Sequence, residues 1–159
     1  MSISIVAVVD PSSSLVEATT SRGEVVTMDA DPPEGNGAAP GPKEMLLVAL
    51  AGCTSMDVAS ILRKKRQSVE AYEIGVEGDT ADEHPRVFTT IRVEHRVRGE
   101  IDAEALRRSI ELSATRYCPV SAMLSAAATM EHWYQLTDAG GNRREALVAV
   151  TGPSGSRVL

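Results

Sequence analysis

The chain has two cysteines, Cys53 and Cys118, and their thiols are the side chains whose chemistry would define a function. A thiolate can attack the O–O bond of a peroxide and become a sulfenic acid, with which a second thiol condenses to a disulfide. Such a pair needs Cα atoms about 4.4–6.8 Å apart. The alternative is that both cysteines are small apolar core residues that take part in no reaction.

The local surroundings of the two thiols differ. Cys53 lies in an apolar helical segment with Asp57 one turn further on, and both features disfavour a thiolate. Cys118 precedes Pro119, which suits the first position of a helix, so Cys118 would be the N-cap and face unpaired backbone N–H groups. From the residues alone, Cys118 is therefore the better candidate for a thiolate. A cysteine that only begins a turn is an equally good reading of Tyr117-Cys118-Pro119.

Metal and hydrolase chemistry have less support in the sequence. Two cysteines cannot make a Cys-rich zinc site, no histidines have a paired spacing, and no metal or organic cofactor is expected. His84 lies in a predicted loop, His95 shares the apolar face of a predicted strand, and His132 begins another strand. Since the sequence places none of them beside a cysteine, a cysteine hydrolase would lack its base.

Composition and charge argue against several classes of partner. The length of 159 residues fits one domain with a core, and a hydrophobic content of 43% argues against disorder outside loops. A formal net charge of −6 and few aromatic residues disfavour nucleic acid as a partner. Residues 1–11 lack the basic start of a signal peptide, and the apolar run 45–62 is barely long enough for a membrane span and contains Asp57. We therefore expect a cytoplasmic protein with no membrane partner.

The elements that would position the two cysteines follow from the residue pattern. Short β-branched runs predict three strands, at residues 3–9, 15–20 and 24–28. Residues 31–41, rich in Pro and Gly, predict an exposed, mobile loop. A long helix should then run from Pro42 to about Arg66, and because it is apolar nearly all round from Met45 to Ala51, other elements should enclose it.

The second half of the chain predicts a hairpin followed by helices and a last core strand. Alternating apolar residues indicate strands at residues 72–77 and 87–97, joined by the loop 78–85. Asp102 is a good N-cap for a second helix, a shorter helix should begin at Pro119, and a core strand should cover residues 130–136. The order predicts an α+β domain at residues 1–137. Residues 138–159 would be an extension with an edge strand at 146–150 and a disordered tail.

Three segments resemble motifs of the OsmC/Ohr family, the osmotically induced and organic hydroperoxide resistance type. The run from Pro42 to Val58 around Cys53 resembles the first cysteine motif of that family, residues 83–89 resemble its hairpin signature, and residues 113–121 around Cys118 resemble its second cysteine motif. The resemblance covers roughly residues 23–136, and the three motifs occur in the right order.

The resemblance implies an OsmC-like fold in which antiparallel sheets wrap a long central helix. It also implies an intertwined homodimer with its active sites at the interface. Cys53 would be the peroxidatic thiol and Cys118 the resolving thiol, which reverses the assignment from the residues alone. Organic hydroperoxides would be the substrate, and a small dithiol or a lipoyl-bearing protein the reductant. Two alternatives are a non-enzymatic module that binds a small apolar ligand or senses thiol state, and a fold-only relative with core cysteines.

The resemblance further implies that an arginine from the N-terminal strands, held by a glutamate near the start of the long helix, supports the thiolate. Glu44 matches the glutamate, although an acidic first-turn residue also stabilises a helix by itself. Arg22 is the only arginine before the helix, although it could equally be an exposed turn residue. Nine positions at about 100° each put Glu44 and Cys53 on opposite faces of a straight helix. Glu44 would therefore act through Arg22.

Overall fold

In the computed structural model, which describes residues 2–159, the N-terminal segment forms a three-stranded antiparallel sheet in the order β1-β2-β3. Its strands are β1 (Ile5–Val9), β2 (Val16–Thr20) and β3 (Val25–Met28), close to the predicted runs. All five residues of β1 are exposed in the single chain, although they are Ile, Val and Ala. The sheet and the loop after it belong to a first compact unit, Met1–Leu46, and the rest forms a second, Leu47–Leu159.

Asp29, directly after β3, organises the loop for which composition predicted an exposed, mobile segment. Its buried carboxylate accepts hydrogen bonds from the backbone N–H groups of Ala30, Asn36 and Ala38 at 2.8, 3.2 and 2.9 Å. These bonds, that from Ala38 first, hold the pKa of Asp29 below its usual value against the opposing effect of desolvation. A single carboxylate therefore ties this loop together.

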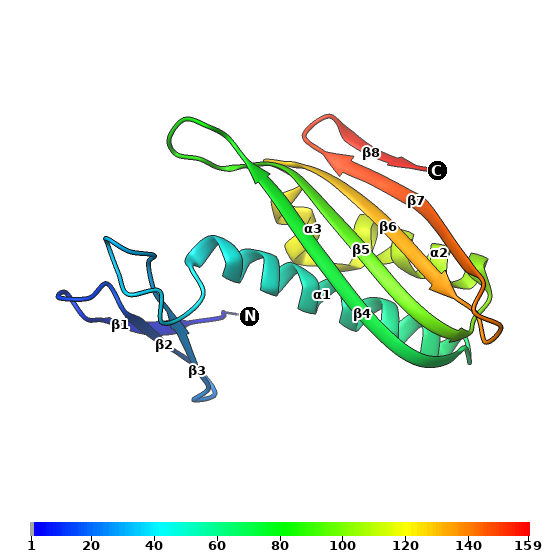
Figure 1. Ribbon diagram of the computed structural model, residues 1–159, viewed down its shortest axis with the longest axis horizontal. Helices are drawn as coiled ribbons and strands as arrows, with labels where there is room; N and C mark the ends of the chain where they lie inside the picture. Colours follow the sequence, from blue (N-terminus) through cyan, green and yellow to red (C-terminus); the bar gives the residue numbers. More distant parts are fainter. Residues whose placement is uncertain (1) are drawn as a thin grey trace. The chain divides into compact units, whose positions relative to one another are not determined.

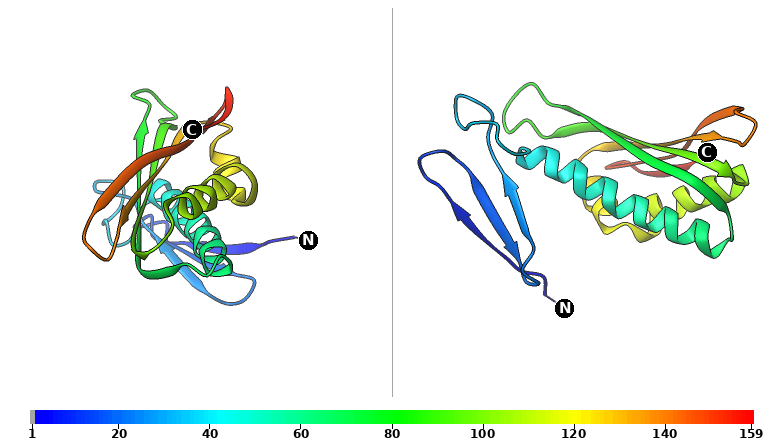
Figure 2. Two further views of the ribbon diagram at one scale, coloured as in Figure 1. Left: turned by 90° about the vertical axis from the view of Figure 1, so that its right-hand side faces the viewer. Right: turned by 60° about the horizontal axis from the view of Figure 1, so that its bottom comes forward.

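The second unit is a five-stranded sheet with helices on one face (Figures 1 and 2). The strand order is β4-β5-β6-β7-β8, with β4 (Ser68–Thr80), β5 (Phe88–Glu100), β6 (Thr129–Thr137), β7 (Arg143–Gly152) and β8 (Gly155–Val158). The helices are α1 (Pro42–Lys64), α2 (Ala103–Leu112) and α3 (Pro119–Leu124), with the π-helical turn η1 (Ser113–Tyr117) between the last two. This is the α+β arrangement of a long helix and mainly antiparallel sheets that the sequence predicted.

The pairing of the strands explains where the helices lie. β4 and β5 form the predicted antiparallel hairpin, whereas β5 and β6 are parallel. Parallel neighbours need a crossover connection, and α2, η1 and α3 supply it. The crossover carries Cys118 over the same face of the sheet that α1 covers (Figure 2).

The C-terminal residues differ from the sequence-based prediction. The predicted edge strand is longer, as β7, and it is not at the edge because β8 pairs with it. The predicted disordered tail contains β8 itself, with Val158 paired to Ala149. The predicted division at residue 137 therefore does not match the structure, since the residues beyond it extend the sheet of the second unit.

The helix α1 buries one row of side chains and leaves the others open. The row is spaced four residues apart and fully buried, and it consists of Leu50, Thr54, Val58 and Leu62. Val48, inside the run 45–51 that the sequence predicted to be enclosed, is 56% exposed, so that prediction is wrong for the single chain, and Met56 further along is 73% exposed. Within residues 2–159, α1 is also the one helix long and apolar enough to cross a membrane, a test that core helices of globular proteins pass as well.

Two apolar clusters make up the core, and a layer of polar side chains separates them. The first cluster includes Val58, Val97 and Tyr134, and the second includes Leu50, Val93 and Met130. On each of α1, β5 and β6, one fully buried polar residue lies between a member of the first cluster and a member of the second. These residues are Thr54 on α1, His95 on β5 and His132 on β6. Buried polar groups of this kind are costly unless they are hydrogen-bonded.

Candidate functional site

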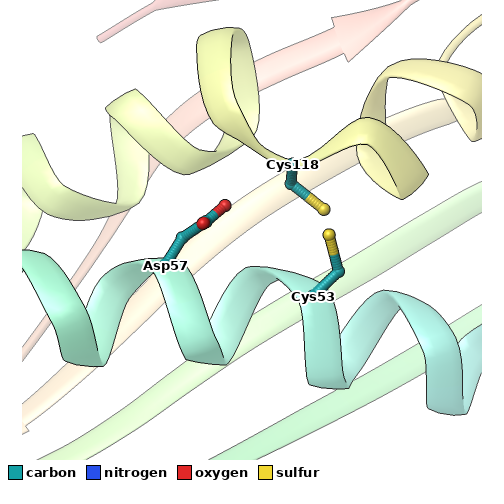
Figure 3. A group of neighbouring side chains, drawn as sticks. All are labelled: Cys53, Asp57 and Cys118. Carbon is teal, nitrogen blue, oxygen red and sulfur yellow. The ribbon is translucent and has the colours of Figure 1, made fainter. Parts of the chain in front are cut away.

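The fold brings the two cysteines together, with Asp57 beside them (Figure 3). Cys53 projects from α1, and Cys118 projects from the junction of η1 and α3. Both sulfur atoms and one carboxylate oxygen of Asp57 lie within 4.8 Å of one another. Both cysteines are free thiols. Residues 65 positions apart in the chain therefore share one site, which is the first requirement for a thiol pair.

Cys118 is the N-cap of α3, as its sequence predicted. Pro119 occupies the first helical position, and the sulfur of Cys118 accepts a hydrogen bond from the backbone N–H of Ser121 at 3.3 Å. Burial nevertheless raises the pKa of the Cys118 thiol to about 12, and a hydrogen bond with Cys53 contributes in the same direction. Burial therefore opposes the thiolate that the helix end favours at Cys118, and the raised pKa favours the protonated thiol.

The π-helical turn η1 is the local feature that presents Cys118. The N–H of Cys118 donates to the carbonyl of Ser113, five residues earlier, at 3.0 Å. Such turns insert one extra residue into a helix and are frequent at functional sites. No residue pattern in the sequence indicated this turn, because its residues are compatible with an ordinary helix.

Asp57 is held in place by a buried hydroxyl. The Oγ of Ser113 lies 3.0 Å from Oδ2 of Asp57 and 3.0 Å from Oγ1 of Thr54. A carboxylate can only accept, so we assign the single proton of Ser113 to Asp57, while Thr54 can return its own proton to Ser113. Both hydroxyl residues are fully buried. The orientation of the Asp57 carboxylate is therefore fixed from the interior of the protein.

A hollow of about 560 Å³ lies beside the site. Its lining includes Asp57, Tyr117 next to Cys118, and the cationic side chain of Lys64. Cys53 and Asp57 are each partly exposed, whereas Cys118 is buried. A small molecule can therefore approach Cys53 and Asp57 from solvent more easily than it can approach Cys118.

The other two predicted site residues, Arg22 and Glu44, belong to the first unit, and each has a partner there. Arg22 lies in the turn between β2 and β3, where its 83% exposed side chain forms an ion pair with Glu24 at 3.0 Å. Glu44 lies in the first turn of α1 and accepts a hydrogen bond from the N–H of Gly41 at 2.8 Å. Arg22 therefore has an ion-pair partner in its own turn, and Glu44 has a hydrogen-bond partner just before its own helix.

Sequence reasoning did not single out Asp57, Ser113 and Thr54 as parts of the site. The spacing of Cys53 and Asp57 was a usable signal, since residues four apart lie on one face of a helix. Ser113 has no such signal, because it reaches Asp57 only through the packing of η1 on α1.

The fold and the site define a small α+β protein with a paired-thiol site. A family model described as OsmC-like protein matches residues 35–132. The chain therefore belongs to the OsmC-like protein family, and the resemblance found in the sequence is confirmed.

Individual relatives agree with this membership. Protein YhfA of Escherichia coli strain K12 is 38% identical over 127 residues, which are 78% of this chain and 95% of that protein. A hypothetical protein from Aquifex aeolicus VF5 is 25% identical, with a TM-score of 0.76 over 87% of this chain and 98% of that one. An organic hydroperoxide resistance protein OsmC from Legionella pneumophila is 14% identical, with a TM-score of 0.62 over 83% of this chain and 95% of that one. The similarity to the Legionella pneumophila protein shows a shared fold.

Proposed function

We propose that this chain is a thiol-dependent peroxidase that reduces organic hydroperoxides to alcohols through Cys53 and Cys118. The observation that carries the proposal is the convergence of the two free thiols from α1 and from the start of α3. The shared fold with an organic hydroperoxide resistance protein supports the same class of substrate. A role in the response to oxidative stress would follow from this activity.

The surroundings of the two thiols support different roles. Cys118 is buried, and its raised pKa keeps it protonated. A protonated, buried thiol suits the resolving role, in which Cys118 reacts only after Cys53 has become a sulfenic acid. Cys53 is the more accessible of the two, which suits the thiol that meets the peroxide first. These roles agree with those that the family resemblance implies.

The proposed cycle balances with one hydroperoxide and one dithiol. The Cys53 thiolate attacks the distal oxygen of the hydroperoxide, the O–O bond breaks, and the alcohol leaves with a proton. The Cys118 thiol then attacks the Cys53 sulfenic acid, forming the disulfide and releasing water. A small dithiol or a lipoyl-bearing reductant returns both cysteines to thiols, and no metal or organic cofactor takes part in these steps.

Arg22 and Glu44 enter the proposal as positioning residues. A guanidinium near Cys53 would favour the thiolate and the charge that develops on the leaving oxygen. Glu44 would hold that arginine rather than contact the sulfur. The Arg22→Gln variant would then reduce cumene hydroperoxide more slowly than the unmodified chain.

The proposed assembly is a cytoplasmic homodimer with active sites at its interface and with no nucleic acid or membrane partner. The five exposed apolar residues of β1 and the exposed Val48 and Met56 of α1 support an apolar interface. Homodimers are typical of the family, which supports the same assembly here.

The deciding experiment counts free thiols in the reduced protein before and after one equivalent of cumene hydroperoxide, beside an equal dose of hydrogen peroxide. We expect two thiols per chain to be lost, faster with the organic peroxide, and both to return with a dithiol. Cys118→Ser should accumulate a sulfenic acid on Cys53, whereas Cys53→Ser should consume no peroxide.

Two other outcomes would contradict the proposal. Thiols that stay unreacted would indicate an OsmC-fold module that binds a small apolar ligand, or a relative with core cysteines only. Thiols that oxidise once but do not support repeated turnover with a dithiol would indicate a redox sensor.

A further inference from the structure

The three side chains of the site also have the ligand types and the spacing of a metal centre. Zinc binds thiolates at about 2.3 Å and carboxylate oxygens at about 2.0–2.2 Å, so ligand atoms around a tetrahedral ion lie roughly 3.5–3.8 Å apart. The sulfur atoms of Cys53 and Cys118 and an oxygen of Asp57 already lie within 4.8 Å of one another (Figure 3). Small side-chain rotations would therefore bring all three atoms to coordination distance.

The carboxylate ligand has an interior hydrogen bond of the kind that metal-binding carboxylates usually have. Oδ2 of Asp57 accepts the hydrogen bond from the buried hydroxyl of Ser113, and the carboxylate keeps further lone pairs with which it can coordinate. Interior hydrogen bonds of this kind fix ligand geometry and strengthen metal binding. Cys53 and Asp57 also lie one turn apart on α1, so the helix backbone sets two of the three ligand positions.

Charge and access are compatible with a bound cation. Two thiolates and one carboxylate carry three negative charges, which a divalent cation neutralises in large part. The hollow lined by Asp57 opens this carboxylate to solvent, and a water molecule would be the fourth ligand of the cation. Lys64, which also lines this hollow, can balance the remaining negative charge.

We propose that the reduced chain binds one thiophilic divalent cation, of the zinc type, through Cys53, Asp57 and Cys118. Binding displaces the protons of the two thiols. An organic hydroperoxide and the cation then compete for the same sulfur atoms, a consequence that rests on the proposed function, whereas the metal site itself does not. When one hydroperoxide and two protons oxidise the two metal-bound thiolates, the products are the disulfide, the alcohol, water and the released cation.

The test is an anaerobic titration of the fully reduced protein with Co²⁺, a spectroscopic substitute for Zn²⁺. We expect one Co²⁺ per chain, with thiolate-to-cobalt charge-transfer absorption and the visible bands of a four-coordinate ion, and its displacement by Zn²⁺. Cys53→Ser and Cys118→Ser should each remove most of the charge-transfer absorption. Asp57→Asn keeps the size and the Ser113 hydrogen bond but should weaken binding about tenfold or more.

The matched control is Asp82→Asn, which makes the same charge change at an exposed loop residue and should bind Co²⁺ as the unmodified chain does. Absence of thiolate–cobalt absorption from protein with two titratable thiols would overturn the metal site. Equal Co²⁺ affinity in Asp57→Asn and the unmodified chain would overturn the three-ligand assignment. Circular dichroism of each variant separates a lost ligand from a lost fold. Asp57→Glu is a second variant for the same purpose, since it keeps a carboxylate at this position.

A second measurement separates this inference from the proposed function. Thiol oxidation by cumene hydroperoxide is followed in chelator-treated protein and in Zn²⁺-loaded protein. We expect Zn²⁺ to slow this thiol oxidation at least about tenfold. Equal oxidation rates in the two samples would contradict competition between the cation and the hydroperoxide for the sulfur atoms. Thiol oxidation without any Co²⁺ binding would support the proposed peroxidase and contradict the metal site. Co²⁺ binding to thiols that peroxide never oxidises would support the metal site and contradict the peroxidase.

Discussion

His95 and His132 are the residues whose protonation the fold restricts most clearly. Nδ1 of His95 lies 2.5 Å from the hydroxyl of Tyr72, and Nε2 of His132 lies 3.4 Å from Oγ1 of Thr151. The other nitrogen of each ring has no partner among residues 2–159. Burial, with a smaller contribution from His132, lowers the pKa of His95 to about 3, and burial lowers the pKa of His132 to about 4. Both rings are therefore neutral in the folded protein.

This neutrality predicts a loss of stability in mild acid. Histidines of the unfolded chain titrate near pH 6.5, so below that pH the unfolded state binds protons that the folded state excludes. Above about pH 6.5 neither state binds these protons, so the two histidines leave the free energy of unfolding unchanged. As the pH falls from about 6.5 toward 4, the unfolded state alone binds them, and the free energy of unfolding decreases. Denaturant unfolding at pH 7.5 and at pH 5 should differ by roughly 2 kcal/mol for each histidine.

Two variants assign this pH dependence to the buried rings. His132→Gln should reduce the difference between pH 7.5 and pH 5 by about half, whatever its effect on stability at either pH. His84→Gln, in an exposed loop, should leave the difference unchanged. An unmodified chain that is equally stable at both pH values would contradict the prediction.

At the scale of elements, the short helix α3 shows how burial and a helix dipole compete. A charge at a helix end gains about 0.3–1 kcal/mol, which is less than one pKa unit. Burial of an ionisable group can shift its pKa by several units. α3 has only six residues, and Cys118 is 3% exposed, so burial decides the protonation of this thiol.

The protonated state of Cys118 predicts slow alkylation. In Cys53→Ser, the remaining Cys118 thiol should react with iodoacetamide at pH 8 at least about tenfold more slowly than free cysteine, because the thiolate is the reacting species. Its rate should keep rising with pH well beyond the pH at which free cysteine levels off. The comparison is repeated in denaturant, where Cys118 should react like free cysteine. Fast alkylation of the folded variant at pH 8 would show that the helix end prevails after all.

At the scale of the whole molecule, the exposed apolar residues of β1 are the feature that one chain does not explain. Ile5, Val6, Val8 and Val9 are each more than half exposed. Exposed apolar residues gathered on one strand are typical of an interface between proteins. We expect this strand to be covered in the proposed homodimer.

The dimer prediction is tested by light scattering after size exclusion. The unmodified chain should have twice the mass of the 16.9 kDa protomer, and Val6→Glu with Val8→Glu should shift it toward the monomer, because the interface would have to bury two charges. Val158→Glu, on β8, makes a similar change at a residue 43% exposed and should not alter the mass. A monomeric unmodified chain at micromolar concentration would contradict the prediction.

The sequence by itself determined the features that depend on neighbouring residues. The alternation of β5, the N-cap Asp102 with its bonds to the N–H groups of Glu104 and Ala105, and the start of α3 at Pro119 were all predicted, because each follows from short-range contacts. The family motifs around Cys53 and Cys118 also identified the fold, because a family preserves both the order and the content of such motifs.

Only the tertiary structure decided what depends on residues far apart in the chain. It paired β6 with β5 in parallel, added β8 beyond β7, and left one side of α1 open. It also brought Cys118 and Ser113 to the helix that carries Cys53 and Asp57, and it buried the Cys118 thiol so that it stays protonated. Burial and long-range proximity arise from packing of the whole chain, and no local run of residues encodes them.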